Sequence, residues 1–159
     1  MTVMGKFEGL WIDAAEWSLD RLAWLAQRRR RTPSTARHLA VGLSGERAAM
    51  FQLRRLGYVV VARRWTSSRM RGDVDLIAWN CGRLCFVEVK TRTARDFHPA
   101  ESAVDDDKRR MLRGLARAYM RSFPERERRT IPVRFDVVSV YSVGGTTEFQ
   151  VFEDAFGWR

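Results

Sequence analysis

Two strand-like segments joined by a short turn decide the fold: residues 72–79, GDVDLIAW, and residues 84–90, LCFVEVK. Residues 80–83, NCGR, lie between them, and a glycine inside so short a connection is typical of a β-hairpin. Counting outward from Asn80 facing Arg83 gives two apolar pairs, Trp79 with Leu84 and Ile77 with Phe86. The sequence therefore predicts an antiparallel hairpin of known register.

The same register brings four charged side chains together. It places Asp75 opposite Glu88 and Asp73 opposite Lys90. Because strand side chains alternate between faces, all four are expected on one face. Two carboxylates opposite one another destabilise a sheet, and burying them unpaired costs more still. A bound divalent cation removes that conflict, so the pattern predicts a metal site.

Lys90 is conspicuous because lysine is rarely tolerated inside an apolar strand without a partner. Only three of the 29 basic residues are lysines. One interpretation is an edge strand on which Lys90 points to solvent and pairs with Asp73. The apolar neighbours of Lys90 on both faces favour a central strand instead.

An acidic residue followed at a distance by Glu-x-Lys is the arrangement of the PD-(D/E)xK nucleases. From about His38 onward, the chain resembles the YraN or UPF0102 family of bacterial endonuclease-like proteins, and it is also similar to archaeal Holliday-junction resolvases. The resemblance is carried by residues 45–49 (GERAA), 56–58 (LGY), 63–65 (RRW), 72–78 (GDVDLIA), 86–92 (FVEVKTR), Lys108 and residues 134–138 (RFDVV).

This resemblance implies an α/β fold with a restriction-endonuclease-like core, a mixed central β-sheet flanked by helices. It implies that Asp75 and Glu88 hold Mg²⁺ or Mn²⁺, completed by the backbone carbonyl of Val89 and water. Lys90 is then expected to position or deprotonate the attacking water. The expected function is a metal-dependent endonuclease acting on DNA, with structured or branched DNA as one form of substrate.

Two acidic residues have alternative roles. Residues 44–56 are predicted to form a helix on whose core side Glu46 lies. Glu46 is either an additional residue of the catalytic site or a first-turn residue that stabilises the helix N-terminus. Asp73 either binds a second cation or only pairs with Lys90. Asp136, on a predicted strand at residues 133–141, is expected to be structural.

Net charge is +10, so a polyanionic partner is expected. Residues 102–123 are predicted to form a helix on which arginines recur every fourth position. Such a row either follows a phosphate backbone or is a solvated basic face. With Arg92 and Lys108, it supplies the predicted nucleic-acid contacts: Arg92, Lys108, Arg109, Arg113 and Arg117.

Two parts are predicted along the chain: an N-terminal helical extension with a basic linker over residues 1–37 and the nuclease-like domain over residues 38–159. The extension either docks on the domain through its amphipathic helix, contacts nucleic acid, binds a partner protein, or reflects a start codon assigned too far upstream. No segment is apolar enough to span a membrane, and two cysteines without a signal peptide favour a reduced, cytoplasmic protein.

Fold alone does not establish activity, so a second hypothesis is kept. In it the chain is a non-catalytic module that binds nucleic acid or a protein and retains the nuclease fold. Dimerisation is common among junction-cutting proteins of this fold. The sequence specifies no interface, and a homodimer stays open.

Overall fold

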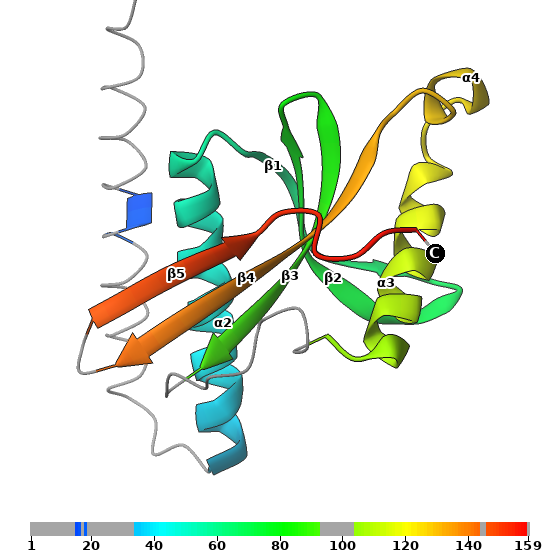
Figure 1. Ribbon diagram of the computed structural model, residues 1–159. Helices are drawn as coiled ribbons and strands as arrows, with labels where there is room; N and C mark the ends of the chain where they lie inside the picture. Colours follow the sequence, from blue (N-terminus) through cyan, green and yellow to red (C-terminus); the bar gives the residue numbers. More distant parts are fainter. Residues whose placement is uncertain (1–14, 17, 19–33, 93–103, 144–145, 159) are drawn as a thin grey trace, which may run out of the picture.

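The computed structural model describes residues 15–16, 18, 34–92, 104–143 and 146–158. Its helices and strands, in chain order, are α2 (Ser34–Arg55), β1 (Val59–Ser67), β2 (Met70–Asn80), β3 (Arg83–Arg92), α3 (Asp106–Met120), α4 (Glu125–Arg128), β4 (Val133–Val143) and β5 (Thr146–Phe152) (Figure 1). None of these described helices combines the length and apolar character needed to cross a bilayer.

The strands form one five-stranded sheet in the order β1-β2-β3-β4-β5. Pairing is antiparallel except between β3 and β4, which run parallel. A parallel pair needs a crossover connection, and α3 lies in it. The predicted mixed sheet with flanking helices is confirmed. Strand β3 lies inside the sheet, between β2 and β4, so the edge-strand interpretation of Lys90 is wrong.

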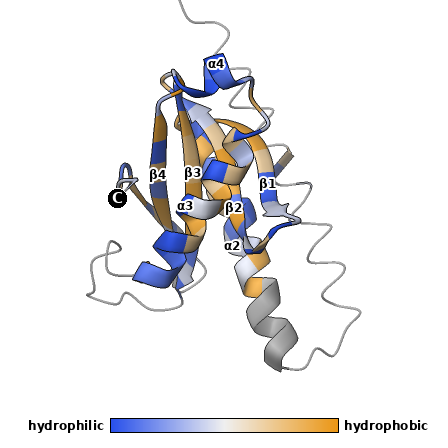
Figure 2. Ribbon diagram, turned by 90° about the vertical axis from the view of Figure 1, so that its right-hand side faces the viewer, coloured by the Kyte–Doolittle hydropathy of each residue, from blue (hydrophilic) through white to orange (hydrophobic). Residues whose placement is uncertain are grey.

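Two apolar layers hold the sheet between α2 and α3. One cluster joins the buried face of α3 to residues such as Ile77, Phe86 and Phe135. The other joins α2 to residues such as Leu76 and Val87 on the opposite face. Figure 2 shows the sheet largely in the colours of apolar residues and α4 in those of polar ones. Because both faces are covered, a charged side chain on a central strand needs a partner inside the protein.

The predicted hairpin register is confirmed. Asn80 pairs with Arg83, and the two apolar pairs follow, Trp79 with Leu84 and Ile77 with Phe86. Both turn residues are left-handed, Cys81 at φ 48° and Gly82 at φ 75°. This is the conformation of a two-residue turn whose twist matches that of the strands.

Two helices differ from their predicted bounds. Helix α2 begins at Ser34 rather than at residue 44, since a glycine such as Gly42 costs a helix interior only about 1 kcal/mol. Helix α3 begins at Asp106 because the Asp105 side chain accepts a hydrogen bond from the Lys108 N–H and caps it. The predicted extension lies mostly outside the described residues, and the division at residue 37 stays a prediction.

Gly45 lets α2 approach the end of β3. A Cβ atom added there would lie 1.9 Å from Thr91 Oγ1 and 3.0 Å from Thr91 Cβ. We expect Gly45→Ala to lower the free energy of unfolding by about 1–3 kcal/mol, because helix and strand must separate. Urea denaturation at neutral pH measures the loss.

Gly42 supplies the control on the same helix. An added Cβ there meets no atom within 4 Å. Gly42→Ala should therefore stabilise the protein by about 0.5–1 kcal/mol, since alanine loses less backbone entropy in a helix. Equal effects of the two substitutions would show that Thr91 does not restrict the approach of α2.

Candidate active site

Glu88 is the centre of the candidate site. It lies on β3 and is 3% exposed. Lys90, two residues along the same strand, places Nζ 3.0 Å from Glu88 Oε1. Lys108, from the first turn of α3, places Nζ 2.9 Å from Glu88 Oε2. The buried carboxylate therefore has one ammonium group at each oxygen.

Asp75 lies beside Glu88 on the neighbouring strand β2 and is 9% exposed. Backbone pairing of β2 with β3 runs as far as Leu76 and Val87. Beyond that pair, the Asp75 side chain forms the hydrogen bond to β3. Its Oδ2 accepts a hydrogen bond of 2.7 Å from the Val89 N–H. Burial, followed by the charge of Glu88, raises the pKa of Asp75 to about 7, although the Val89 hydrogen bond opposes the rise.

The sheet is irregular next to Asp75. Val74 and Ile77 both pack in the cluster on the α3 face, whereas Leu76 packs on the α2 face. Strict alternation therefore fails between Val74 and Ile77. On the paired strand β1, Arg64 is left-handed at φ 46°, an unusual conformation for a residue other than glycine.

This irregularity changes the partner of Asp73. Asp73 pairs with Thr66 across β1, and its Oδ2 lies 3.4 Å from Arg64 Nε. The predicted pairing of Asp73 with Lys90 is wrong, because the β2–β3 ladder has ended and Lys90 contacts Glu88. Arg64 is a residue of the site that sequence reasoning did not predict. Its place in the RRW triplet was the only signal, and nothing in the sequence indicates a left-handed arginine.

Glu46 approaches the same end of the sheet from α2. It lies in the middle of the helix, so the interpretation as a first-turn residue is wrong. Burial, which outweighs the opposing charge of Arg64, raises its pKa, and the charges of Asp73 and Glu88 add to the rise. Its Oε2 is buried without a hydrogen bond among the described residues and lies 3.9 Å from Arg64 Nε.

The predicted nucleic-acid contacts lie in two places. Arg92 is the last residue of β3, two positions beyond Lys90. Lys108 lies inside the site, on Glu88. The arginine row of α3 packs along the C-terminal segment, residues 153–158: the guanidinium groups of Arg109 and Arg113 lie over the Phe156 ring, and that of Arg117 lies over the Trp158 ring.

The donor set at this site fits a hard divalent cation. Asp75 and Glu88 are adjacent buried carboxylates whose charges repel, and Glu46 offers a buried oxygen that has no hydrogen bond within the described part of the chain. Oxygen ligands of this kind suit Mg²⁺ or Mn²⁺. Among the described residues, no three His, Cys, Asp or Glu side chains lie close enough to enclose a metal. Two carboxylates with water are therefore the set to consider, and a ligand role for the Val89 carbonyl stays a prediction.

Burial of the Asp75 carboxylate should destabilise the fold at alkaline pH. Its folded pKa of about 7 lies above the ordinary 3.8, so its stabilising contribution is complete below about pH 4 and is lost as pH rises through 7. Asp75→Asn removes the charge and keeps an oxygen for the Val89 N–H. We expect this variant to exceed the wild-type free energy of unfolding by roughly 2 kcal/mol at pH 8.

Urea denaturation in EDTA at pH 5 and pH 8 measures this difference. The gain should be larger at pH 8, because the folded wild type holds its proton at the lower pH. A variant that is less stable than the wild type at pH 8 would contradict the prediction. That result would mean that the lysines compensate fully for the ionised pair.

The comparisons with known protein families and with individual proteins point to the same family. The model of the Uncharacterised protein family UPF0102 matches residues 45–140. A UPF0102 protein of Koribacter versatilis is 45% identical over 124 residues, which cover 78% of this chain and 84% of that protein. A UPF0102 protein of Solibacter usitatus is 47% identical over 113 residues, covering 71% and 80%. With Asp75, Glu88 and Lys90 inside the matched region, this chain belongs to the UPF0102 family.

Proposed function

We propose that this protein is a Mg²⁺- or Mn²⁺-dependent endonuclease that hydrolyses phosphodiester bonds of DNA. The observation that carries the proposal is Glu88, a carboxylate buried on a central strand beside Asp75 and ion-paired to Lys90 and Lys108. Such a group is expensive to bury, and hydrophobic residues would serve a purely structural role at least as well. A requirement for charge at this position explains its presence.

Asp75 and Glu88 would hold the cation between β2 and β3. When bound, the cation acidifies a water molecule and neutralises charge on the phosphate. Lys90 and Lys108 orient Glu88 by holding its two oxygens. Each ammonium group has three N–H donors, so each retains donors for a phosphate oxygen or the attacking water. Lys90, with its side chain 32% exposed, is the better placed of the two to meet substrate.

DNA as the substrate is supported by the resemblance to the PD-(D/E)xK nucleases and by the net charge of +10. The charges close to the site agree with a phosphate substrate. Arg64 Nε lies 3.4 Å from Asp73 Oδ2 and its side chain is more than half exposed, and Arg92 ends the strand that carries Glu88. Phosphate contacts of this kind position a nucleic acid without reading its sequence.

A panel of labelled DNAs tests the proposal directly: duplex, single strand, flap and four-way junction, each with Mg²⁺, Mn²⁺ or EDTA. We expect cleavage that requires the cation and that Asp75→Asn abolishes. Cleavage in EDTA, or equal cleavage by Asp75→Asn, would assign the activity to a contaminant. No cleavage of any substrate by the wild type, with DNA binding retained, would favour the rival function.

That rival is a nucleic-acid-binding module without catalysis, and one observation favours it. Each oxygen of Glu88 already has a lysine ammonium group within ion-pair distance, so the charge of Glu88 itself is compensated without a cation. Calorimetric titration with Mn²⁺ separates the two functions. A nuclease should bind Mn²⁺ and lose this binding in Asp75→Asn, whereas a satisfied structural site should bind none.

A further inference from the structure

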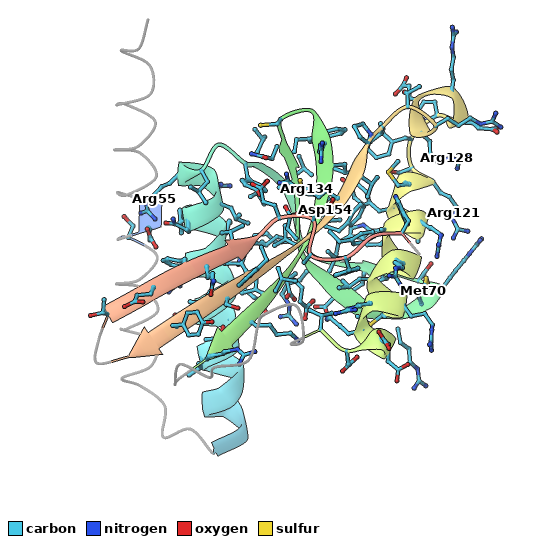
Figure 3. The ribbon with its side chains drawn as sticks, viewed as in Figure 1. Arg55, Met70, Arg121, Arg128, Arg134 and Asp154 are labelled. Atoms are coloured by element: carbon cyan, nitrogen blue, oxygen red, sulfur yellow. The ribbon has the colours of Figure 1, made fainter. Side chains whose placement is uncertain are left out.

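A second basic site lies at the other end of α3. The helix, α4 and the C-terminal segment line an open cavity of about 620 Å³. Four arginines line it, Arg117, Arg121, Arg128 and Arg129, of which Arg129 is ion-paired to Glu125. Figure 3 shows Arg121 and Arg128 projecting from α3 and α4 on the same side of the molecule. So many positive charges around one cavity favour an anionic ligand.

The cavity also has an apolar wall with an aromatic ring. Met120 and Ile131 contribute to it, and Trp158 is 37% exposed. The Trp158 indole is held in place, because Phe135 meets it edge-on with ring centroids 5.1 Å apart. The Arg117 guanidinium lies over the indole at 5.3 Å from the ring centroid. A positioned ring beside a stacked guanidinium is a platform for a planar base.

We propose that this cavity, named here the arginine–tryptophan pocket, binds a single-stranded segment of nucleic acid. A base stacks against Trp158 and Arg117, and the phosphates contact Arg121 and Arg128. An acidic peptide would use the same arginines but would leave the indole and the apolar wall without a planar partner. Single-stranded nucleic acid matches the charged groups and the aromatic wall together.

The position of the pocket gives it a place in the proposed nuclease function, on which this part of the inference rests. Lys108 and Arg121 lie 13 positions apart, from the first turn of α3 to its C-cap. At 1.5 Å per residue this is about 20 Å, the length of about six stacked nucleotides. A strand held in the pocket thus reaches the Glu88 site, so the substrate carries a single-stranded arm next to the cleaved bond.

Fluorescence anisotropy with a short labelled oligothymidylate tests the pocket in EDTA, where cleavage cannot contribute. Arg121→Gln/Arg128→Gln should lower the affinity about tenfold and reduce the slope of log affinity against log salt by about 0.7 for each phosphate that is no longer neutralised. The matched control is Arg83→Gln/Arg126→Gln, which removes the same charge from exposed positions outside the pocket. It should change the affinity less than about threefold.

A second arm tests base stacking. The wild type should prefer the oligothymidylate over an abasic strand of equal length. Trp158→Ala should remove that preference, a change of about tenfold, and Trp158→Phe should restore most of it. Retention of this preference in Trp158→Ala would overturn the base platform.

Two further outcomes would also overturn the proposed pocket. Equal losses in the pocket variant and its control would reduce the effect to net charge and overturn the site. Displacement of the oligonucleotide by polyglutamate as readily as by unlabelled oligothymidylate would identify an acidic-peptide site instead. Failure of the nuclease assay leaves these binding measurements unaffected, so the two proposals fail separately.

Discussion

Glu88→Gln is expected to lower the rate of cation-dependent DNA cleavage by about 10²–10³-fold, the scale of losing a preorganised charged group in an active site. The substitution keeps the shape of the side chain and removes its charge. One anionic ligand for the cation is lost, and Lys90 and Lys108 lose the carboxylate that positions them. Single-turnover cleavage of the best substrate from the DNA panel measures the effect.

Two variants separate charge from geometry in this prediction. Glu88→Asp keeps the charge but withdraws it by one methylene, so it should retain part of the activity. Glu148→Gln removes a carboxylate from an exposed position on β5 and should leave the rate within about twofold. A Glu88→Gln protein that is folded, binds DNA and cleaves it at a rate within about threefold of the wild-type rate would contradict the proposed active site.

The hairpin at the centre of this site was predictable because its signals are local. The turn at residues 80–83 fixed the register, and alternation then placed Ile77 with Phe86. The same count placed Asp75 next to Glu88, which the electrostatic coupling of the two groups supports. Apolar neighbours also identified β3 as a central strand.

The predicted partner of Asp73 was wrong because the side chains of β2 do not alternate strictly between the two faces of the sheet. The left-handed Arg64 and the step between Val74 and Ile77 redirect Asp73 from Lys90 to β1. A glycine at position 64 would have signalled a left-handed residue, whereas arginine carries no such signal. Strain of this kind next to a site is set by tertiary packing.

Long-range contacts limited what the spacing of the basic residues could predict. Lys108 was assigned to nucleic acid, yet the crossover brings it onto Glu88, 20 positions earlier in the chain. Spacing on α3 predicted the arginine row correctly as one face. It gave no indication that the C-terminal segment covers that face, where Arg113 Nε donates to the Gly157 carbonyl at 2.8 Å.

A buried ion pair between Arg134 and Asp136 holds this C-terminal segment. Asp136 on β4 is fully buried, and its Oδ1 lies 2.8 Å from Arg134 Nε and accepts a 3.0 Å hydrogen bond from the Asp154 N–H. The Tyr58 hydroxyl donates to Asp136 Oδ2 at 3.2 Å. Figure 3 shows Arg134 and Asp154 close together where the C-terminal segment leaves β5. The structure thus agrees with the structural role predicted for Asp136.

Asp136→Ala is expected to lower the free energy of unfolding by about 3–5 kcal/mol, because it leaves a buried guanidinium with one fewer counter-charge and an N–H without its acceptor. Urea denaturation at pH 7 measures the loss.

Glu153→Ala is the matched control, because Glu153 Oε2 contacts the same guanidinium at 2.7 Å but its side chain is 56% exposed. Solvent screens that pair, so its removal should cost at most about 1 kcal/mol. Arg134→Met/Asp136→Leu removes both buried charges and should be more stable than Asp136→Ala, because no uncompensated ion is left inside. If Asp136→Ala and Glu153→Ala had equal effects, burial would not decide the strength of this pair, and the segment would be held by its aromatic contacts, Phe156 stacked on Phe135 at 4.8 Å.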